Sequence, residues 1–278
     1  MNHDIPLGKT TEYYNQYKPE LLFPVARQIK RDELGLTDKL PFFGCDIWNA
    51  YEMSWLNTQG KPQAAIGVFE FSSDSENIIE SKSFKLYLNS FNQTPFESWQ
   101  QVKKTLSEDL TAVAKGIVEV KLFTLQEYNK EYPITEWDAM TIDDVDVEIS
   151  QYDYQASLLA IEHTKDSSQE IVEEKLTSDL LKSNCLITNQ PDWASILIQY
   201  KGAKIHHESL LKYLISFRTH NEFHEQCVER VFTDIMEYCK PQELTVYARY
   251  TRRGGLDINP FRTNIEGRKA LNLRLVRQ

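Results

Sequence analysis

An internal repeat is the feature that most constrains the fold of this chain. Residues 80–91 read ESKSFKLYLNSF, and a half-matching copy, ESLLKYLISF at 208–217, recurs roughly 126 residues later. Apolar strand-like runs precede both copies, and amphipathic helical patterns follow both. The repeat therefore predicts two related halves. Because the copies have diverged in their polar residues, we expect one composite site.

Apolar periodicity predicts the same order of elements in both halves. The expected elements, in chain order, are strand 63–71, helix 84–91, helix 96–113, strand 116–123, strand 195–200, helix 210–217, helix 223–235 and strand 244–250. Helices placed between antiparallel strand pairs favour an α+β fold over an alternating α/β fold. We expect residues from about 125 to 170 to be connection and approach strands.

Composition narrows the class of protein. With 41% hydrophobic and 26% charged residues, the 278-residue chain falls in the range of soluble globular proteins. A formal charge of −10 disfavours tight nucleic-acid binding, which needs clustered Lys and Arg. No run of 18 apolar residues occurs, and the N-terminal residues 1–8 lack the pattern of a secretory leader. We therefore expect a cytoplasmic protein with neither membrane nor direct nucleic-acid partners.

The four cysteines are expected to be reduced thiols, because a chain of this length without a leader rarely carries a disulfide framework. Cys185 lies seven residues before Asp192, and Asn189, Gln190 and Pro191 between them favour a chain reversal. A nucleophile beside a proton donor is one interpretation. A buried thiol near a turn-forming aspartate is the other. Cys45, Cys227 and Cys239 are interpreted as structural.

Two segments predict polar groups at helix starts. Ser81 or Ser83 is a good N-cap, which would gather Lys82 and free N–H groups into an anion-binding site or serve as plain capping. In the second half, capping by Asn221 or Thr219 would place His224 and Glu225 in the first turn of a helix. There the glutamate either complements the helix dipole or serves a site.

Several familiar motifs are missing or incomplete. His224-x-x-Cys227 lacks a second ligand pair, so zinc is disfavoured. No G-x-G-x-x-G follows a strand, and Gly8-Lys9-Thr10 lacks the upstream glycine of a P-loop. The segment 252–255, RRGG, could bind phosphate through arginine and glycine N–H groups or form an exposed turn.

Together these motifs resemble a known family. The motifs are ESKSFK at 80–85, SNC with an aspartate at 183–192, FHExC at 223–227 and RRGG at 252–255. In this order they resemble the NADPH-dependent 7-cyano-7-deazaguanine reductases, the nitrile reductases of queuosine biosynthesis, in their long tandem form; residues 46–55 also fit that form. The resemblance implies tandem tunnelling-fold units, each an antiparallel sheet with two helices on one face. It divides the chain into an N-terminal half, 1–140, and a C-terminal half, 141–278.

The resemblance also implies a reaction, the reduction of a nitrile to a primary amine with two NADPH and without metal. It further implies a homodimer. Cys185 would form a thioimide with the nitrile, and Asp192 would move protons, with His224 the next candidate to assist the thiol. The substrate-binding residues implied are Glu80, His224 and Glu225. The cofactor-binding residues implied are Ser81, Lys82, Arg253 and Gly254.

Three rival interpretations remain at this level. An amidinotransferase of the same fold would form the same thioimide but use ammonia, and would not need the Ser81-Lys82 segment. A zinc-dependent cyclohydrolase of the fold would need a metal site. A purine- or pterin-binding module would bind ligand without turnover and without any need for Cys185.

Overall fold

The structure is a computed structural model that describes residues 12–37, 39–162 and 171–278. The N-terminal segment examined for a leader and Gly8-Lys9-Thr10 lie outside these residues. The strands are β1 (Pro24–Ala26), β2 (Phe43–Leu56), β3 (Pro62–Ser72), β4 (Asn77–Ile79), β5 (Val118–Phe123), β6 (Met140–Thr141), β7 (Ile171–Asn184), β8 (Pro191–Ala203), β9 (Glu243–Tyr250) and β10 (Leu256–Thr263). The helices are α1 (Gln28–Glu33), α2 (Ser81–Ser90), α3 (Trp99–Ala114), α4 (Leu125–Glu131), α5 (His207–Ile215) and α6 (His224–Tyr238), with short 3-10 turns at Pro19–Leu21, Ala156–Leu158 and Ser216–Thr219.

One sheet unites the two halves. Within the described residues, eight strands form it in the order β5-β3-β2-β10-β9-β8-β7-β6. Neighbouring strands are antiparallel except β6, which runs parallel to β7. The halves meet where β10 pairs with β2, from Leu256 opposite Ala50 to Thr263 opposite Phe43. The division expected between residues 140 and 141 falls within β6 and stays a prediction.

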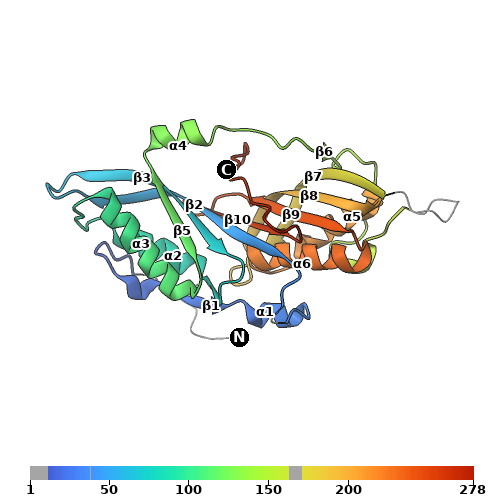
Figure 1. Cartoon of the computed structure of the whole chain (residues 1–278), viewed down its shortest axis with the longest axis horizontal. Helices are drawn as coiled ribbons and strands as arrows, with labels where there is room; N and C mark the ends of the chain where they lie inside the picture. The colour runs from blue at the N-terminus through green and yellow to red at the C-terminus, as the bar shows by residue number, and fades with distance from the viewer. Residues whose placement is uncertain (1–11, 38, 163–170) are drawn as a thin grey trace.

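Two helices cover the sheet in each half, as the repeat predicts (Figure 1). The buried face of α2 carries Phe84, Tyr87 and Phe91, which pack with α3 and with Trp48 of β2 in one core. A second core lies under α5 and α6, against β8 and β9. The α+β class, the antiparallel sheet and the helices on one face are thus confirmed. The sequence did not predict β2, β7 or β10, which complete the sheet.

The segment between the halves departs from the expectation. Residues expected to be connection and approach strands contain α4, so that part of the prediction was wrong. Thr124 caps this helix with a reciprocal capping box to Glu127. Tyr128 of α4 is 1% exposed and packs on the face of the sheet opposite the four large helices. The local cap and this one buried ring account for the helix.

A buried chain of ion pairs fastens the N-terminal segment to both halves. Arg27 pairs with Asp46 at 2.6 Å, and Arg262 of β10 pairs with Asp46 at 2.8 Å. Arg262 also pairs with Glu229 of α6 at 2.9 Å, and Arg31 of α1 pairs with Glu229 at 2.7 Å. All five side chains are at most 6% exposed. Each charge has an opposite partner, which buried charges require.

Candidate active site

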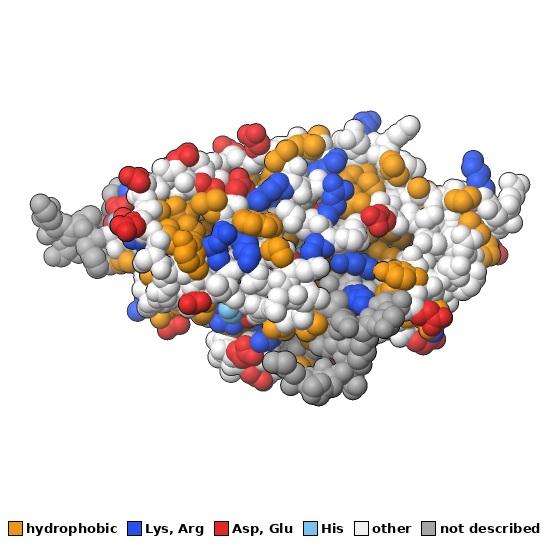
Figure 2. All heavy atoms as spheres, turned by 180° about the vertical axis from the view of Figure 1, so that it is seen from behind, with side chains coloured by type: hydrophobic (Ala, Val, Ile, Leu, Met, Phe, Trp, Pro, Cys, Tyr) orange, Lys and Arg blue, Asp and Glu red, His pale blue; other side chains and the backbone are white. Residues whose placement is uncertain are grey.

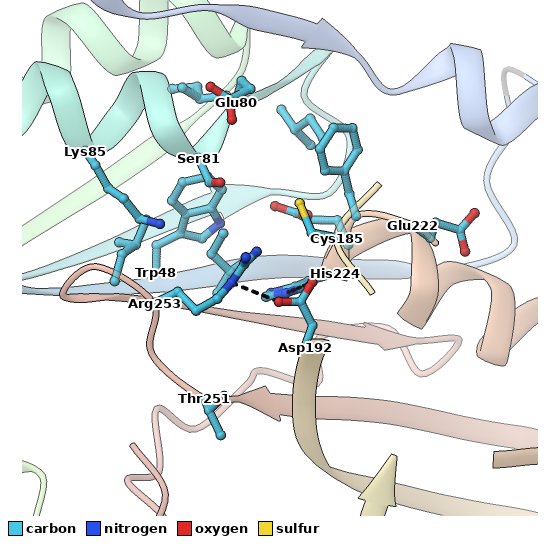
Figure 3. Close-up of a pocket in the computed structure, with 16 residues that line it drawn as sticks. Trp48, Glu80, Ser81, Lys85, Cys185, Asp192, Glu222, His224, Thr251 and Arg253 are labelled. Carbon is cyan, nitrogen blue, oxygen red and sulfur yellow. Dashed lines mark ion pairs between the residues drawn. The ribbon is translucent and has the colours of Figure 1, made fainter. Parts of the chain in front are cut away.

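A pocket lies where the two halves meet, between the N-terminal ends of α2 and α6 (Figure 3). Its walls come from both halves: β2, β4 and α2 on one side, and the β7–β8 turn, α6 and β10 on the other. The lining residues are Trp48, Ile78, Ile79, Glu80, Ser81, Lys85, Cys185, Asp192, Glu222, Phe223, His224, Glu225, Thr251, Arg253, Leu256 and Ile258. The site is therefore composite, as the diverged repeat predicts.

The residues expected from the sequence gather here, with two exceptions. Lys82 and Gly254 line a neighbouring cavity of about 620 Å³ instead. Lys85 and Leu256 line both cavities, so the two adjoin one another. The structure thus separates the expected residues into a first pocket with the thiol and carboxylates and a second cavity with Lys82 and Gly254.

The chain reversal between Cys185 and Asp192 is a β-hairpin turn. Asn184 at the end of β7 faces Pro191 at the start of β8. The Cys185 N–H donates to the Gln190 carbonyl at 2.8 Å, and the Asn189 N–H donates to the Cys185 carbonyl at 3.1 Å. Asn189 has φ +57°, the left-handed conformation that asparagine tolerates well. The predicted reversal is confirmed, and it brings both side chains into one pocket.

The turn also lowers the pKa of the Cys185 thiol below its ordinary value. Burial works against the thiolate. Hydrogen bonds from the Thr188 hydroxyl and from the N–H groups of Ile187 and Thr188 favour it more strongly, and Arg253 adds to them. A thiolate surrounded by donors is the reactive form of cysteine. The assistance that the sequence assigned to Asp192 or His224 comes in the structure chiefly from the turn itself.

Asp192 is held from two sides. Its carboxylate lies 3.3 Å from His224 Nε2 and 3.0 Å from Arg253 Nε, and the side chain is 3% exposed. The His224 ring stacks on Tyr250 with centroids 3.7 Å apart and planes within 5°. Its Nδ1 is buried and has no hydrogen-bond partner within the described residues. The imidazole is therefore fixed in orientation, with one ring nitrogen left for another group.

The helix caps differ from the expectation. Glu80, and neither Ser81 nor Ser83, is the N-cap of α2; its carboxylate accepts from the N–H groups of Lys82 at 2.9 Å and Ser83 at 2.8 Å. The prediction of a serine cap was wrong because a carboxylate one residue earlier meets the same N–H groups. With a side chain 1% exposed at the pocket wall, Glu80 combines capping with a place in the site.

The N-cap of α6 is Phe223, with no side-chain cap, so the expected capping by Asn221 or Thr219 was wrong. The predicted position of His224 and Glu225 in the first turn is confirmed. Glu225 is 3% exposed, and burial together with repulsion from Asp46 raises its pKa to about 7. Glu225 can therefore hold or release a proton near neutral pH, as groups at functional sites often do.

The second cavity suits an anionic ligand. It borders the first turn of α2, whose Lys82 and Lys85 line it. Gly254 and Gly255 contribute the turn between β9 and β10, with φ +57° and +70°. A Cβ on Gly255 would come within 2.4 Å of the Glu52 side chain, so only glycine leaves this part of the cavity open.

Three lining or supporting residues were missed as site residues. Lys85 lies between the two cavities, and its pKa is lowered by burial and by the charge of Arg253. Its i+4 spacing from Ser81 on α2 could have revealed it. Thr188 was hidden within a polar turn. Trp48 stands in an apolar strand pattern, where nothing distinguishes a pocket wall from core.

All four cysteines are free and buried. Burial raises the pKa of Cys45, Cys227 and Cys239, as expected of structural thiols.

Within the described ranges, no cluster of three or more His, Cys, Asp or Glu side chains has the arrangement of a metal site. In the same ranges no helix has the length and apolarity needed to cross a bilayer.

Two family models match parts of this chain. Residues 13–122 match a family model described as nitrile reductase, 7-cyano-7-deazaguanine-reductase N-terminal part. Residues 191–269 match a second model described as QueF-like protein. A solved structure of the archaeosine synthase QueF-Like, in the apo form, aligns at 18% identity over 35% of this chain and 95% of its own, with a TM-score of 0.30. That overlap is too partial to bear on activity.

Proposed function

Because the chain belongs to the 7-cyano-7-deazaguanine reductase family of nitrile reductases, we propose that it reduces the nitrile of 7-cyano-7-deazaguanine to 7-aminomethyl-7-deazaguanine with NADPH. The observation that carries the proposal is the Cys185 thiol. It has a lowered pKa and shares one pocket with Asp192 and two buried carboxylates, Glu80 and Glu225. The pocket thus combines a nucleophile with carboxylates that can bind the donors of a base.

The thiol begins the chemistry. The Cys185 sulfur adds to the nitrile carbon, one C–N π bond opens, and the nitrogen takes up a proton to give a thioimide. The proton balance is even, because the thiol loses the proton that the nitrogen gains. Asp192 passes protons to this nitrogen, and its contacts with His224 and Arg253 hold the carboxylate in place.

The carboxylates orient the base. A guanine-like ring presents N–H and NH₂ donors, and carboxylates accept them. Glu80 and Glu225 lie at the starts of α2 and α6, on opposite walls, so the ring would be held between the two halves. His224, stacked on Tyr250, adds one free ring nitrogen to this set.

The second cavity is where we place the nicotinamide cofactor. NADPH would supply hydride when bound, and its phosphates would be held by the lining residues Lys82, Lys85 and Gly254. Ser81 and Arg253 line the first pocket, each next in sequence to a residue of the second cavity, and complete the proposed cofactor set. A homodimer is the expected assembly.

The test counts cofactor. We expect the native protein to oxidise two NADPH per nitrile, measured as the loss of NADPH absorbance. We expect no oxidation by Cys185→Ala. Cys239→Ala is the matched control, because that thiol is also buried but lies outside the pocket lining. Full turnover by Cys185→Ala would contradict the proposal. A thiol-linked adduct without NADPH oxidation would indicate amidine formation, and ligand binding with neither signal would indicate a binding module.

A further inference from the structure

One polar group on the pocket wall has no partner. Trp48 of β2 is 2% exposed and lines the first pocket. Its indole Nε1 is buried and has no hydrogen-bond partner within the described residues. A buried N–H without an acceptor destabilises the protein, so each such group calls for an explanation. The unpartnered indole of Trp48 therefore points to a missing acceptor in the pocket.

The Trp48 ring cannot turn to find another partner. Phe84 of α2 packs edge-on against it with centroids 5.2 Å apart and planes at 85°, and Phe71 of β3 lies at 5.2 Å. The backbone of Trp48 is paired on both sides, with Ile258 and with Phe69. Figure 3 shows the ring on the pocket wall between Lys85 and Cys185. The direction of the N–H is thus fixed by packing.

The carboxylates of the pocket cannot serve every polar atom of a guanine-like ring. Glu80 and Glu225, as carboxylates, accept hydrogen bonds and would pair with the donors of a base. Arg253 also donates, but its Nε is engaged by Asp192 at 3.0 Å and its Nη1 by the Gln190 side chain at 2.6 Å. A guanine-like ring also carries an exocyclic carbonyl oxygen, which needs a donor. A neutral indole N–H on an apolar wall meets that need.

We propose that Trp48 donates a hydrogen bond to the exocyclic carbonyl oxygen of the bound deazaguanine ring, and that this contact selects 6-oxo bases over bases without the oxygen. The inference rests on the proposed function. Trp48 is then a specificity residue as well as a core residue. A site built to pair a buried polar group discriminates strongly against a ligand that leaves the group unpaired.

The experiment uses two ligands that lack the nitrile and so cannot react with Cys185: 7-deazaguanine, and 2-amino-7-deazapurine, which lacks the carbonyl oxygen and the adjacent ring proton. Calorimetric titration measures both dissociation constants for the native protein and for Trp48→Phe. We expect Trp48→Phe to raise the dissociation constant of 7-deazaguanine about ten-fold to a hundred-fold, the range of one lost buried hydrogen bond. The dissociation constant of 2-amino-7-deazapurine should change far less.

Trp55→Phe is the matched control. Trp55 is on the same strand, is 1% exposed, belongs to the same core and packs against Trp99 away from the pocket lining. It should lose stability as Trp48→Phe does, yet bind both ligands as the native protein does. Equal weakening of both ligands by Trp48→Phe, or no weakening, would overturn the inference alone. No binding of 7-deazaguanine by the native protein would overturn the proposed function as well.

Discussion

All four cysteine thiols of this protein are buried, but the pKa of one of them differs in direction from the other three. Burial raises the pKa of Cys45, Cys227 and Cys239, because a thiolate is poorly solvated inside the protein. Cys185 is also buried, at 8% exposure, but hydrogen-bond donors in its own turn lower its pKa. Reactivity at the residue scale is therefore decided by donors within one turn, and burial alone does not predict it.

Replacing Thr188 by valine tests this cause. The substitution removes the hydroxyl donor while keeping the side-chain shape, so the pKa of Cys185 should rise. The thiolate fraction at neutral pH then falls, and the alkylation profile with iodoacetamide moves to higher pH. We expect alkylation at pH 7 to slow by about three- to ten-fold, the scale of the net contribution of one hydrogen bond. Mass spectrometry of the Cys185 peptide measures the rate.

The control for Thr188→Val is Thr233→Val. Thr233 lies on α6, and its hydroxyl donates to the Glu229 carbonyl at 2.8 Å, outside the pocket lining. It should leave the alkylation profile of Cys185 unchanged. An unchanged profile in Thr188→Val itself would show that the hydroxyl has no part in lowering the pKa of the thiol.

At the scale of elements, the proposed cofactor cavity depends on a two-glycine turn. Gly254 and Gly255 join β9 to β10 with positive φ, and their missing side chains keep Lys85 and Glu52 where they border the cavity. The first turn of α2 forms the facing wall. The Lys82 and Lys85 side chains of α2 and the backbone of the glycine turn thus offer positive charge and N–H groups to an anion from two directions.

Gly255→Ala separates backbone strain from cavity shape. The alanine would be strained at φ +70°, and its Cβ would displace the Glu52 side chain into the cavity. We expect the free energy of unfolding to fall by about 1 kcal/mol. We also expect the KM for NADPH to rise roughly five-fold or more. Steady-state kinetics and urea unfolding measure the two effects.

Gly60→Ala is the matched control, because Gly60 has φ +76° in the β2–β3 turn with nothing within 4 Å of an added Cβ. It should show the same loss of stability with an unchanged KM. If Gly255→Ala kept the native KM for NADPH, the second cavity would not be the cofactor site.

At the scale of the whole molecule, the site depends on how the halves are joined. β10 pairs with β2, and Arg262 of β10 pairs with both Asp46 and Glu229. Glu225 lies one helical turn before Glu229 on α6, and the negative charge of Asp46 helps to raise the pKa of Glu225. The ion pairs thus connect the fusion of the halves to the first pocket.

Arg262→Met tests the importance of this junction. Two buried carboxylates would lose a shared partner, and removing one partner of a buried pair typically costs about 3–5 kcal/mol. We expect a large fall in unfolding free energy, measured in urea. Lys104→Met is the control, because the Lys104–Glu108 pair is exposed, at 3.8 Å, and should contribute about 0.5 kcal/mol or less. Similar small losses in both variants would show that the network does not hold the halves together.

The sequence by itself determined the repeated elements, because apolar periodicity reports directly which face of a helix or strand is buried. It also determined the Cys185–Asp192 reversal, since turn residues act locally. The resemblance implied the site residues, but periodicity and spacing could not bring them together. The missed strands β2 and β10 show the limit of such local reading, because β10 and the centre of β2 are buried on both faces and lose their alternation.

Only the tertiary structure decided which groups surround the thiol and where the pocket lies. The partners of Asp192 come from α6 and from the turn after β9, 32 and 61 residues farther along the chain. The unpaired N–H of Trp48 depends on rings from α2 and β3. Such contacts join residues distant in sequence, and their geometry follows from how the two halves share one sheet. Local propensity carries no record of that arrangement.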